Sequence, residues 1–266
     1  MPTPPPHAPP GDLAARLGGR RVTVCLPARD EAATVGRIVS VIRRELVEAS
    51  PVVAEVLVVD DGSSDATAAV AAAAGARVVG GGGFGKGQAM WTGVAEATGD
   101  LVVFCDADVS SFAAHFVTGL LGPLLGDDRV QLVKGTFDRP LDGRAAQGGR
   151  VTELLAKPLL RALYPALASI AQPLAGECAG RREVLETLPF VAGYGVDIGL
   201  LLDMAELFGA ASIAQVHLGY RSHRNRPLCE LTVQADAILA TVLARAGIGP
   251  AVDECPPLVV RGVLYD

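Results

Sequence analysis

The chain has 266 residues, 50% of them hydrophobic, and carries a formal net charge of −6 at pH 7. This length and composition favour a globular protein with a substantial core, in one large domain or two small ones. The acidic balance argues against a nucleic-acid-binding protein, because such proteins usually present a broad basic surface.

The termini and the cysteines indicate where the protein works. Residues 1–19 are rich in proline and lack the apolar region of a signal peptide, so we expect a flexible leader there, and a C-terminal tail over residues 251–266. The apolar segment 154–176 contains two basic residues and three prolines, which argues against a membrane span. The five cysteines form no C-x-x-C pair, and their odd number argues against a disulfide scaffold. We therefore expect a cytoplasmic protein with no membrane partner.

Short β-branched runs alternate with helical patterns through the first half of the chain. The predicted strands are residues 21–27, 55–60, 76–79, 101–108 and 130–135. The first predicted helix carries four apolar residues on one face: Ile38, Val39, Ile42 and Leu46. The later helices follow Ser64, end near Ala97 and cover about residues 112–124. This alternation predicts a mostly parallel sheet covered by helices.

After about residue 140 the pattern changes. Helices are predicted over residues 151–164 and 196–209, followed by an extended segment at 212–224 and a terminal helix. We therefore divide the chain into a nucleotide-binding α/β part, residues 20–140, and a part for a second ligand, residues 141–250. The second part is expected at the carboxyl edge of the same sheet, where open α/β sheets bind ligands.

Two aspartates, Asp106 and Asp108, end the apolar run that begins at residue 101. Residues two apart on a strand point the same way, with Cα atoms about 6.5 Å apart, so both carboxylates could face one ligand. Two like charges so placed need a cation, and Mg²⁺ takes one or two protein carboxylates and completes its shell with phosphate oxygens and water. The pair therefore predicts a divalent metal with a diphosphate, although D-x-D alone is a weakly specific motif.

The glycine loop at residues 80–87 allows more than one interpretation. It fits the P-loop pattern G-x-x-x-x-G-K, but Gly87 stands where a P-loop has the Ser or Thr that holds Mg²⁺. It also contains G-x-G-x-x-G with Asp106 about twenty residues on, which makes a dinucleotide oxidoreductase the rival from another class. That fingerprint normally needs one acid and follows the first strand, whereas this loop follows the third. We expect Lys86 to contact a phosphate or a base edge, with a solvated lysine as the alternative.

The motif RSHRNR ends the predicted extended segment. If the strand persists, Arg221, His223 and Asn225 share one face and could bind a metal-bound diphosphate, although a basic solvated strand end has the same pattern. The other histidines in apolar surroundings, His115 and His217, are expected to be structural.

A second anion site is suggested where glycines precede the helix at residues 148–155. The free backbone N–H groups of its first turn, with Arg150 and Thr152, can form a phosphate or carboxylate cradle, and a plain helix start is equally compatible. In the same way, Asp60 and the DDGSS motif could bind a ligand or could form a turn and helix cap.

Together these motifs resemble the glucosyl-3-phosphoglycerate synthases, retaining GT-A glycosyltransferases of family 81, from residue 20 to about residue 246. The matching motifs are LPARDEAATV, VDDGSSD, GKGQAMW, DAD, GRVTEL, PLAGE, YGVDIGLLLD and RSHRNR. The resemblance implies an α/β GT-A fold, a Rossmann-like nucleotide-diphospho-sugar transferase with a mostly parallel central sheet and a helical acceptor region. It also implies a homodimer that moves glucose from UDP-glucose to the 2-hydroxyl of 3-phosphoglycerate with Mg²⁺, Mn²⁺ or Co²⁺.

The resemblance further implies roles for particular residues. The uridine end of the donor would be held by Pro27, Ala28, Glu31, Asp60 and Lys86. The metal would be ligated by Asp108 and His223, with donor groups oriented by Asp106 and Arg221 and with Asn225 near the diphosphate and the acceptor. The phosphoglycerate would be bound by Gly149, Arg150 and Thr152, and the sugar pocket would be lined by Leu174 and Asp197. Asp197 stands where the family has Glu, so mannosyl-3-phosphoglycerate synthesis from GDP-mannose is the alternative within the class.

Overall fold

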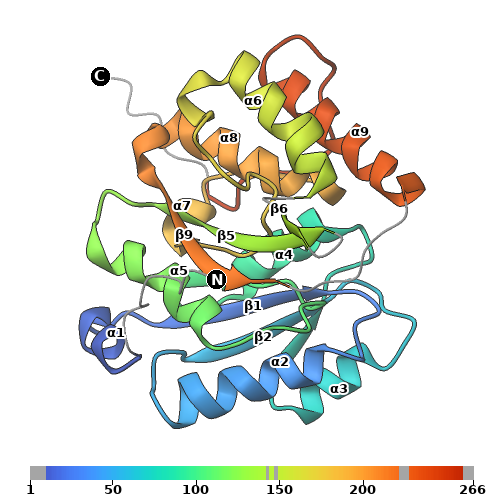
Figure 1. Cartoon of the computed structure of the whole chain (residues 1–266). Coiled ribbons are helices and arrows are strands. Elements are labelled where there is room, and N and C mark those ends of the chain that lie inside the picture. Colours follow the sequence, from blue (N-terminus) through green and yellow to red (C-terminus); the bar gives the residue numbers. More distant parts are fainter. Residues whose placement is uncertain (1–9, 142–143, 147–148, 222–227, 260–266) are drawn as a thin grey trace.

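The computed structural model describes residues 10–141, 144–146, 149–221 and 228–259. An eight-stranded sheet forms the centre of the molecule, with helices on both of its faces (Figure 1). The α/β class predicted from the sequence is therefore confirmed.

The first half of the sheet is parallel. Its strands, in sheet order, are β3 (Arg77–Gly80), β2 (Glu55–Asp60), β1 (Val22–Ala28) and β4 (Leu101–Phe104). The central strands are almost wholly buried, as expected of parallel strands that are covered on both faces. Because these strands run the same way, the loops that leave β1, β2 and β4 meet at one edge of the sheet.

The second half of the sheet is mixed. β7 (Cys178–Arg181) runs antiparallel between β4 and β5 (Leu132–Leu141), and β9 (Ile213–Tyr220) runs parallel to β5. β6 (Arg144–Ala146) pairs antiparallel with the end of β5. A separate two-stranded ribbon joins β8 (Phe190–Val191) to β10 (Glu254–Cys255). The sheet is mostly parallel, as predicted, with β7 as the antiparallel strand between its two halves.

Helices from the first half of the chain pack in one apolar cluster against the sheet. They are α1 (Pro10–Leu17), α2 (Val35–Ile42) with its π-helical continuation η1 (Arg43–Glu48), α3 (Thr67–Ala73) and α5 (His115–Gly126). The predicted apolar face of the α2 region is confirmed, because Ile38, Val39, Ile42 and Leu46 are all fully buried.

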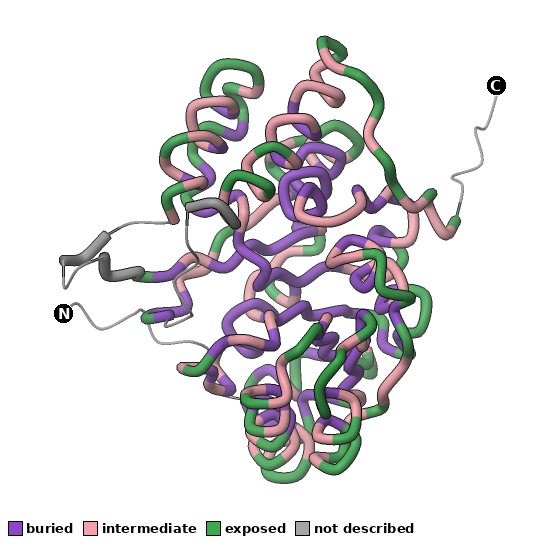
Figure 2. The backbone as a smooth tube through the Cα atoms, turned by 90° about the vertical axis from the view of Figure 1, so that its right-hand side faces the viewer, coloured by how far each residue is buried: buried purple, intermediate pink, exposed green. Residues whose placement is uncertain are grey.

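The opposite face of the sheet is covered by α4 (Lys86–Glu96), α7 (Arg182–Leu185) and α8 (Val196–Phe208). A further apolar cluster packs α8 against η2 (Thr152–Ala156), α6 (Lys157–Leu163) and α9 (Leu228–Arg245), which form the upper layer of Figure 1. Short 3₁₀ turns link these elements: η3 (Pro165–Leu167), η4 (Gly193–Gly195) and η5 (Ala210–Ser212). Figure 2 shows the buried backbone concentrated in the sheet and in the helix faces that cover it.

Both predicted terminal segments contain ordered elements. Residues 10–17 were expected in the flexible leader but form α1, because Leu13 and Leu17 lie one turn apart and are buried next to α5. Within the predicted tail, Glu254 and Cys255 pair with β8. Residues 1–9 and 260–266 lie outside the described residues.

The apolar segment 154–176 does not form one long helix. It is divided among η2, α6 and η3, with Pro158 at the start of α6 and Pro165 at the start of η3. Within the described part of the chain, no helix has both the length and the apolar character needed to cross a membrane.

Gly87 packs closely against β8 at the start of α4, and Gly122 in α5 provides a control for its substitution. A Cβ at Gly87 would overlap the backbone carbonyl of Val191, whereas a Cβ at Gly122 in α5 would meet nothing within 4 Å. We expect Gly87→Ala to lower the free energy of unfolding by about 1–3 kcal/mol through overpacking. Gly122→Ala should raise it by up to about 1 kcal/mol, because alanine favours helices more than glycine does. Urea unfolding measures both changes, and a stabilising Gly87→Ala would contradict the close approach of α4 to β8.

Candidate active site

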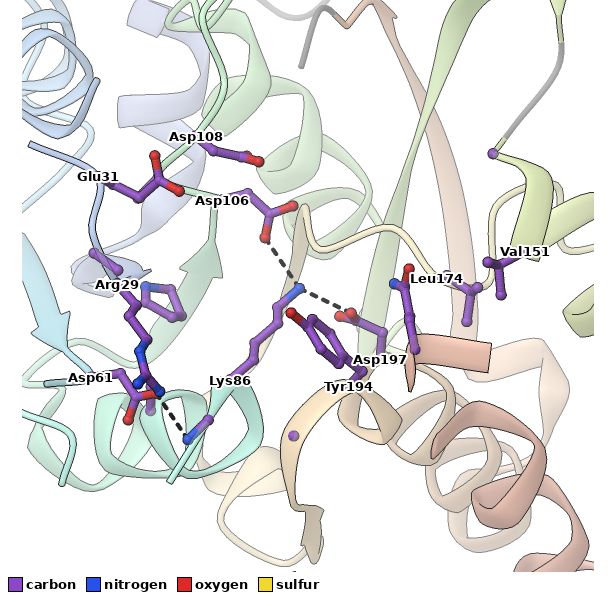
Figure 3. Close-up of a pocket in the computed structure, with 18 of the residues that line it drawn as sticks. Arg29, Glu31, Asp61, Lys86, Asp106, Asp108, Val151, Leu174, Tyr194 and Asp197 are labelled. Carbon is purple, nitrogen blue, oxygen red and sulfur yellow. Dashed lines mark hydrogen bonds and ion pairs between the residues drawn. The ribbon is translucent and has the colours of Figure 1, made fainter. Parts of the chain in front are cut away.

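A cavity of about 450 Å³ lies at the carboxyl edge of the parallel strands. Its walls come from the loops after β1, β2 and β4, the start of α4, η4, and residues 149–152. Figure 3 shows three groups of side chains around this space: Arg29, Glu31 and Asp61 at one end, Lys86, Asp106 and Asp197 in the middle, and Leu174 and Val151 at the other end. The two ends of the cavity therefore offer different chemistry.

Asp106 and Asp108 lie in the turn after β4 and not on a strand. The strand ends at Phe104, so the expectation that the two aspartates share one strand face is wrong. Their carboxylates nevertheless converge on Arg221, whose Nη2 lies 2.7 Å from Asp106 Oδ2 and 3.4 Å from Asp108 Oδ1. Both aspartates line the cavity. Both carboxylates can therefore face one ligand, as predicted, but a turn and not a strand places them.

Arg221 directly follows β9 and is buried. Its Nη1 donates a hydrogen bond of 2.6 Å to Oε2 of Glu177, which is fully buried, and its guanidinium carbon lies 5.5 Å from the ring centre of Phe137. Burial alone would lower the pKa of Arg221, but attraction by Glu177 and the two aspartates outweighs burial and raises it. The guanidinium is therefore a fixed positive charge beside the cavity.

Lys86 is the first residue of α4 and joins the two sides of the cavity. Its Nζ lies 3.1 Å from Asp106 Oδ1 and 2.9 Å from Asp197 Oδ2. The side chain is only 22% exposed, so the alternative of a solvated lysine is wrong. Burial would lower the pKa of Lys86, but Asp106 and Asp197 together raise it above its ordinary value.

Six charged side chains thus form one connected set. We call them the ion-pair network: Lys86, Asp106, Asp108, Glu177, Asp197 and Arg221. Burial would raise the pKa of Asp106, yet Lys86 and Arg221 hold it well below its ordinary value. Asp106 is therefore ionised at neutral pH.

The glycine loop does not form a P-loop. Gly85 has a φ of 98°, which favours glycine, and it turns the chain into α4. The overlap of any Cβ at Gly87 with Val191 excludes the Ser or Thr of a P-loop at that position. The loop also follows β3 at the edge of the sheet, which is not the place of a dinucleotide fingerprint.

One end of the cavity contains most of the residues expected at the uridine. The lining residues there are Pro27, Ala28, Arg29, Glu31 and Asp61. Asp60 is not among them, because its Oδ1 accepts a hydrogen bond of 3.3 Å from the Ser63 amide and closes a turn. The turn interpretation of the DDGSS motif therefore describes Asp60, while the neighbouring Asp61 reaches the cavity.

Asp61 has an incomplete set of hydrogen bonds in the described structure. Its Oδ2 accepts a hydrogen bond of 2.9 Å from the Gly85 amide, and Arg29 Nη1 lies 3.9 Å from the same oxygen. Its Oδ1 is buried and has no hydrogen-bond partner among the described residues. A buried acceptor of this kind is costly unless a donor is supplied, so this end of the cavity suits a ligand with an N–H group.

The other end of the cavity is formed by the predicted anion cradle and sugar pocket. Its lining residues include Gly149, Arg150, Thr152 and Leu174, and Asp197 lies between Leu174 and the middle of the cavity. A continuous helical stretch begins at Arg150, whose side chain is exposed, while Thr152 is buried. Asp197, in the first turn of α8, has a buried Oδ1 without a hydrogen-bond partner among the described residues. This end can therefore accept a hydrogen bond and receive an anion.

His223 and Asn225 lie outside the described residues. Among the residues that are described, no group of three or more His, Cys, Asp or Glu could hold a metal ion. Asp106 and Asp108 do line the same cavity, and a hard divalent cation needs only one or two protein carboxylates when phosphate and water complete its shell. The donor set fits such an ion, with His223 as the further ligand that the resemblance implies.

Some cavity residues were not predicted from the sequence. Arg29 and Asp61 belong to the motifs LPARDEAATV and VDDGSSD, which the sequence places at this edge of the sheet, although neither residue was given a role of its own. Tyr194 of η4 and Gln234 of α9 also line the cavity, and no local pattern indicates them. Glu177 ends the PLAGE motif, and nothing in that motif indicates that its carboxylate is the buried partner of Arg221.

The described histidines, His115 and His217, make contacts within the fold. His115 Nε2 lies 3.0 Å from the Leu218 carbonyl, and His217 Nε2 lies 3.4 Å from an Asp138 oxygen. Neither lines the cavity. Cys25 and Cys105 are buried in the core, and burial raises the pKa of both thiols.

The chain is similar to known proteins in both sequence and structure. A family model described as Glycosyl transferase family 2 matches residues 23–188. The glucosyl-3-phosphoglycerate synthase of Mycolicibacterium smegmatis is 47% identical over 249 residues, which are 89% of this chain and 81% of that protein. The synthase of Petrotoga mobilis is 42% identical over 85% of this chain and 73% of its own length.

A crystal structure of the Mycobacterium tuberculosis glucosyl-3-phosphoglycerate synthase is also similar. It superposes with a TM-score of 0.86 at 41% identity, over 96% of this chain and 95% of that one. That crystal contains Mn²⁺, UDP-glucose and phosphoglyceric acid.

The ion-pair network predicts that the stabilising effect of Asp106 depends on pH. Although burial opposes them, Lys86 and Arg221 lower its folded-state pKa. Ionised Asp106 therefore stabilises the fold above the unfolded-state pKa of about 3.9, and this contribution is lost as the pH falls toward the folded-state pKa. We expect Asp106→Asn to lower the free energy of unfolding at pH 7 by on the order of 3 kcal/mol, and by less at pH 3. Urea unfolding at both pH values measures the difference, and a constant effect would contradict the assignment.

Proposed function

The chain belongs to the glucosyl-3-phosphoglycerate synthases, and the Glycosyl transferase family 2 model covers its residues 23–188. We propose that it transfers glucose from UDP-glucose to the 2-hydroxyl of 3-phosphoglycerate. The product is glucosyl-3-phosphoglycerate, with the anomeric configuration retained. One observation supports the proposal: a single cavity combines paired carboxylates and cations in its middle with residues of the β1 and β2 loops at one end and Gly149, Arg150 and Thr152 at the other. UDP-glucose and phosphoglyceric acid in the M. tuberculosis crystal support the same donor and acceptor.

The uridine occupies the end of the cavity near β1 and β2 in this proposal. Pro27, Ala28 and Glu31 line this end and hold the uridine, and Lys86 adjoins them from the middle of the cavity. Asp61 joins them, because its buried Oδ1 can accept the N–H of the uracil ring. Asp60 then acts through the turn that it closes on Ser63, which positions Asp61.

The diphosphate lies at the ion-pair network. A divalent cation held by Asp108 and His223 supplies positive charge to the departing nucleoside diphosphate. Asp106 and Arg221 orient the donor, and the resemblance implies a role for Asn225 at the diphosphate. Arg221 is fixed by Glu177, so its charge is in place before the leaving group departs.

The acceptor binds at the cradle formed by Gly149, Arg150 and Thr152. Arg150 pairs with the phosphate or carboxylate of 3-phosphoglycerate, and the resemblance implies that Asn225 also binds the acceptor. Leu174 provides an apolar wall of the sugar pocket. The unpartnered Oδ1 of Asp197 accepts a hydrogen bond from a glucose hydroxyl.

Transfer proceeds by attack on the face from which the nucleotide leaves. The bond from the anomeric carbon to the UDP oxygen breaks as the bond to the acceptor oxygen forms, and the hydroxyl proton passes to a phosphate oxygen of the leaving group. Glu177 is unsuited as a covalent nucleophile, because it is fully buried and bonded to Arg221. Asp197 is held by Lys86.

We further infer that the protein is a homodimer in the cytoplasm. Two packed elements of the upper layer, η2 and α9, expose large apolar side chains, Leu154 and Val233, which suit a contact with a second copy. Cys25, Cys105, Cys178 and Cys255 are free thiols, which fits a reducing compartment.

A donor and metal assay tests the proposed function. UDP-glucose, GDP-glucose and GDP-mannose are each offered with 3-phosphoglycerate, with Mg²⁺ or with EDTA, and nucleotide release and the product anomer are measured. We expect release from UDP-glucose with retention, and a loss of about 100-fold or more in EDTA. Preference for GDP-mannose would support the mannosyl alternative, and nucleotide binding without release would refute transferase activity.

Arg150→Ala tests the assignment of the acceptor end. Loss of one charge-assisted hydrogen bond should raise the KM for 3-phosphoglycerate by about 10- to 100-fold. The Kd for UDP with Mn²⁺ should stay within about twofold, because the nucleotide end is formed by other elements. Arg161→Ala, at an exposed position on α6, is the matched control. Equal losses of acceptor use and UDP binding would contradict the two-ended cavity.

A further inference from the structure

Lys134 in β5 is a buried charge that the mechanism above does not use. The residue is 2% exposed and is among the largest fully buried side chains of the protein. A buried ammonium is costly unless a partner compensates it. Its Nζ donates a hydrogen bond of 2.6 Å to the backbone carbonyl of Ala175. Lys134 therefore fixes the carbonyl of Ala175 from within the core.

That peptide belongs to residues 172–177, the loop that leads into β7. β5 holds this loop at three points. The buried side chain of Gln172 donates to the Phe137 carbonyl at 2.7 Å, Lys134 donates to the middle of the loop, and the Gly135 amide donates to the Glu177 carbonyl at 2.8 Å. Lys134 supplies the contact at the centre of the loop.

The same loop contacts the cavity on both sides of Ala175. Leu174 lines the cavity on one side. On the other side, Gly176 lies so close to Asp106 that an added Cβ would overlap its carboxylate. The next residue, Glu177, holds Arg221, which in turn holds Asp106 and Asp108. The position of the Ala175 peptide therefore affects the sugar wall and the ion-pair network together.

We propose that Lys134 is a positioning residue for glucosyl transfer: by fixing the Ala175 carbonyl, it places Leu174 at the sugar and Glu177 against Arg221. The proposal rests on the proposed function. Lys134 does not line the cavity and acts through the loop. Because the uridine end is formed by β1, β2 and α4, loss of the Lys134 contact affects turnover more than nucleotide binding.

Lys134→Met tests this role, because methionine has a similar length and carries no donor. We expect kcat to fall by about 10- to 100-fold, since small displacements of reacting groups have effects of this size. The Kd for UDP with Mn²⁺ should stay within about twofold. Hydrogen exchange should become faster in residues 174–177 and remain unchanged in β1. Lys157→Met is the control, because this partly buried lysine of α6 pairs with Glu153 and lies outside the cavity lining.

Lys134→Gln separates the hydrogen bond from the charge. The glutamine amide can donate to the loop without carrying a charge, so we expect a kcat between those of Lys134→Met and the unaltered chain. Lys134→Gln also replaces Lys134→Met as the test if Lys134→Met does not fold. A wild-type kcat together with wild-type exchange in residues 174–177 would overturn the proposal. If the unaltered chain transfers no glucose, the proposed function fails, while the exchange rates still decide whether Lys134 positions the loop.

Discussion

The ion pairing of Arg221 is the interaction on which the site depends. A guanidinium this deeply buried is stable only when carboxylates surround it, because an uncompensated buried charge costs several kcal/mol. Its partners come from the turn after β4 and from the loop before β7, 115 and 44 residues away in sequence. The network therefore forms only when these segments and the end of β9 meet, and folding of the mixed sheet assembles the middle of the cavity.

Close backbone approach is the second constraint on this assembly. Gly176 leaves room for the Asp106 carboxylate, and Gly87 leaves room for the carbonyl of Val191. Gly85 combines a positive φ with an approach of its hypothetical Cβ to 3.2 Å from Gly193 Cα. These contacts join the first half of the chain to the second. Small residues thus allow two parts of different topology to share one cavity wall.

The parallel half of the fold and its functional edge could be predicted, because buried strands and their following acids give local patterns. The geometry of Asp106 and Asp108 could not, since β4 ends at Phe104 and a turn places them. Glu177 and Lys134 carried no local signal, because the partners that explain their burial lie 44 and 41 residues away. Helix α1 was missed because its two buried leucines follow a proline-rich stretch. No local sequence pattern indicates which polar and charged groups on different elements will pair.

The ion-pair network carries an excess of negative charge, and its two cations, Lys86 and Arg221, differ in how far they are exposed. Four carboxylates face Lys86 and Arg221, which leaves a formal charge of −2 when all six groups are ionised. A divalent cation would neutralise that excess, and the diphosphate bound with it would then compete with Asp106 and Asp197 for Lys86. The Lys86 side chain is 22% exposed and that of Arg221 is 4% exposed. Lys86 can therefore exchange partners when the donor binds, while the buried Arg221 keeps its position and its ion pairs.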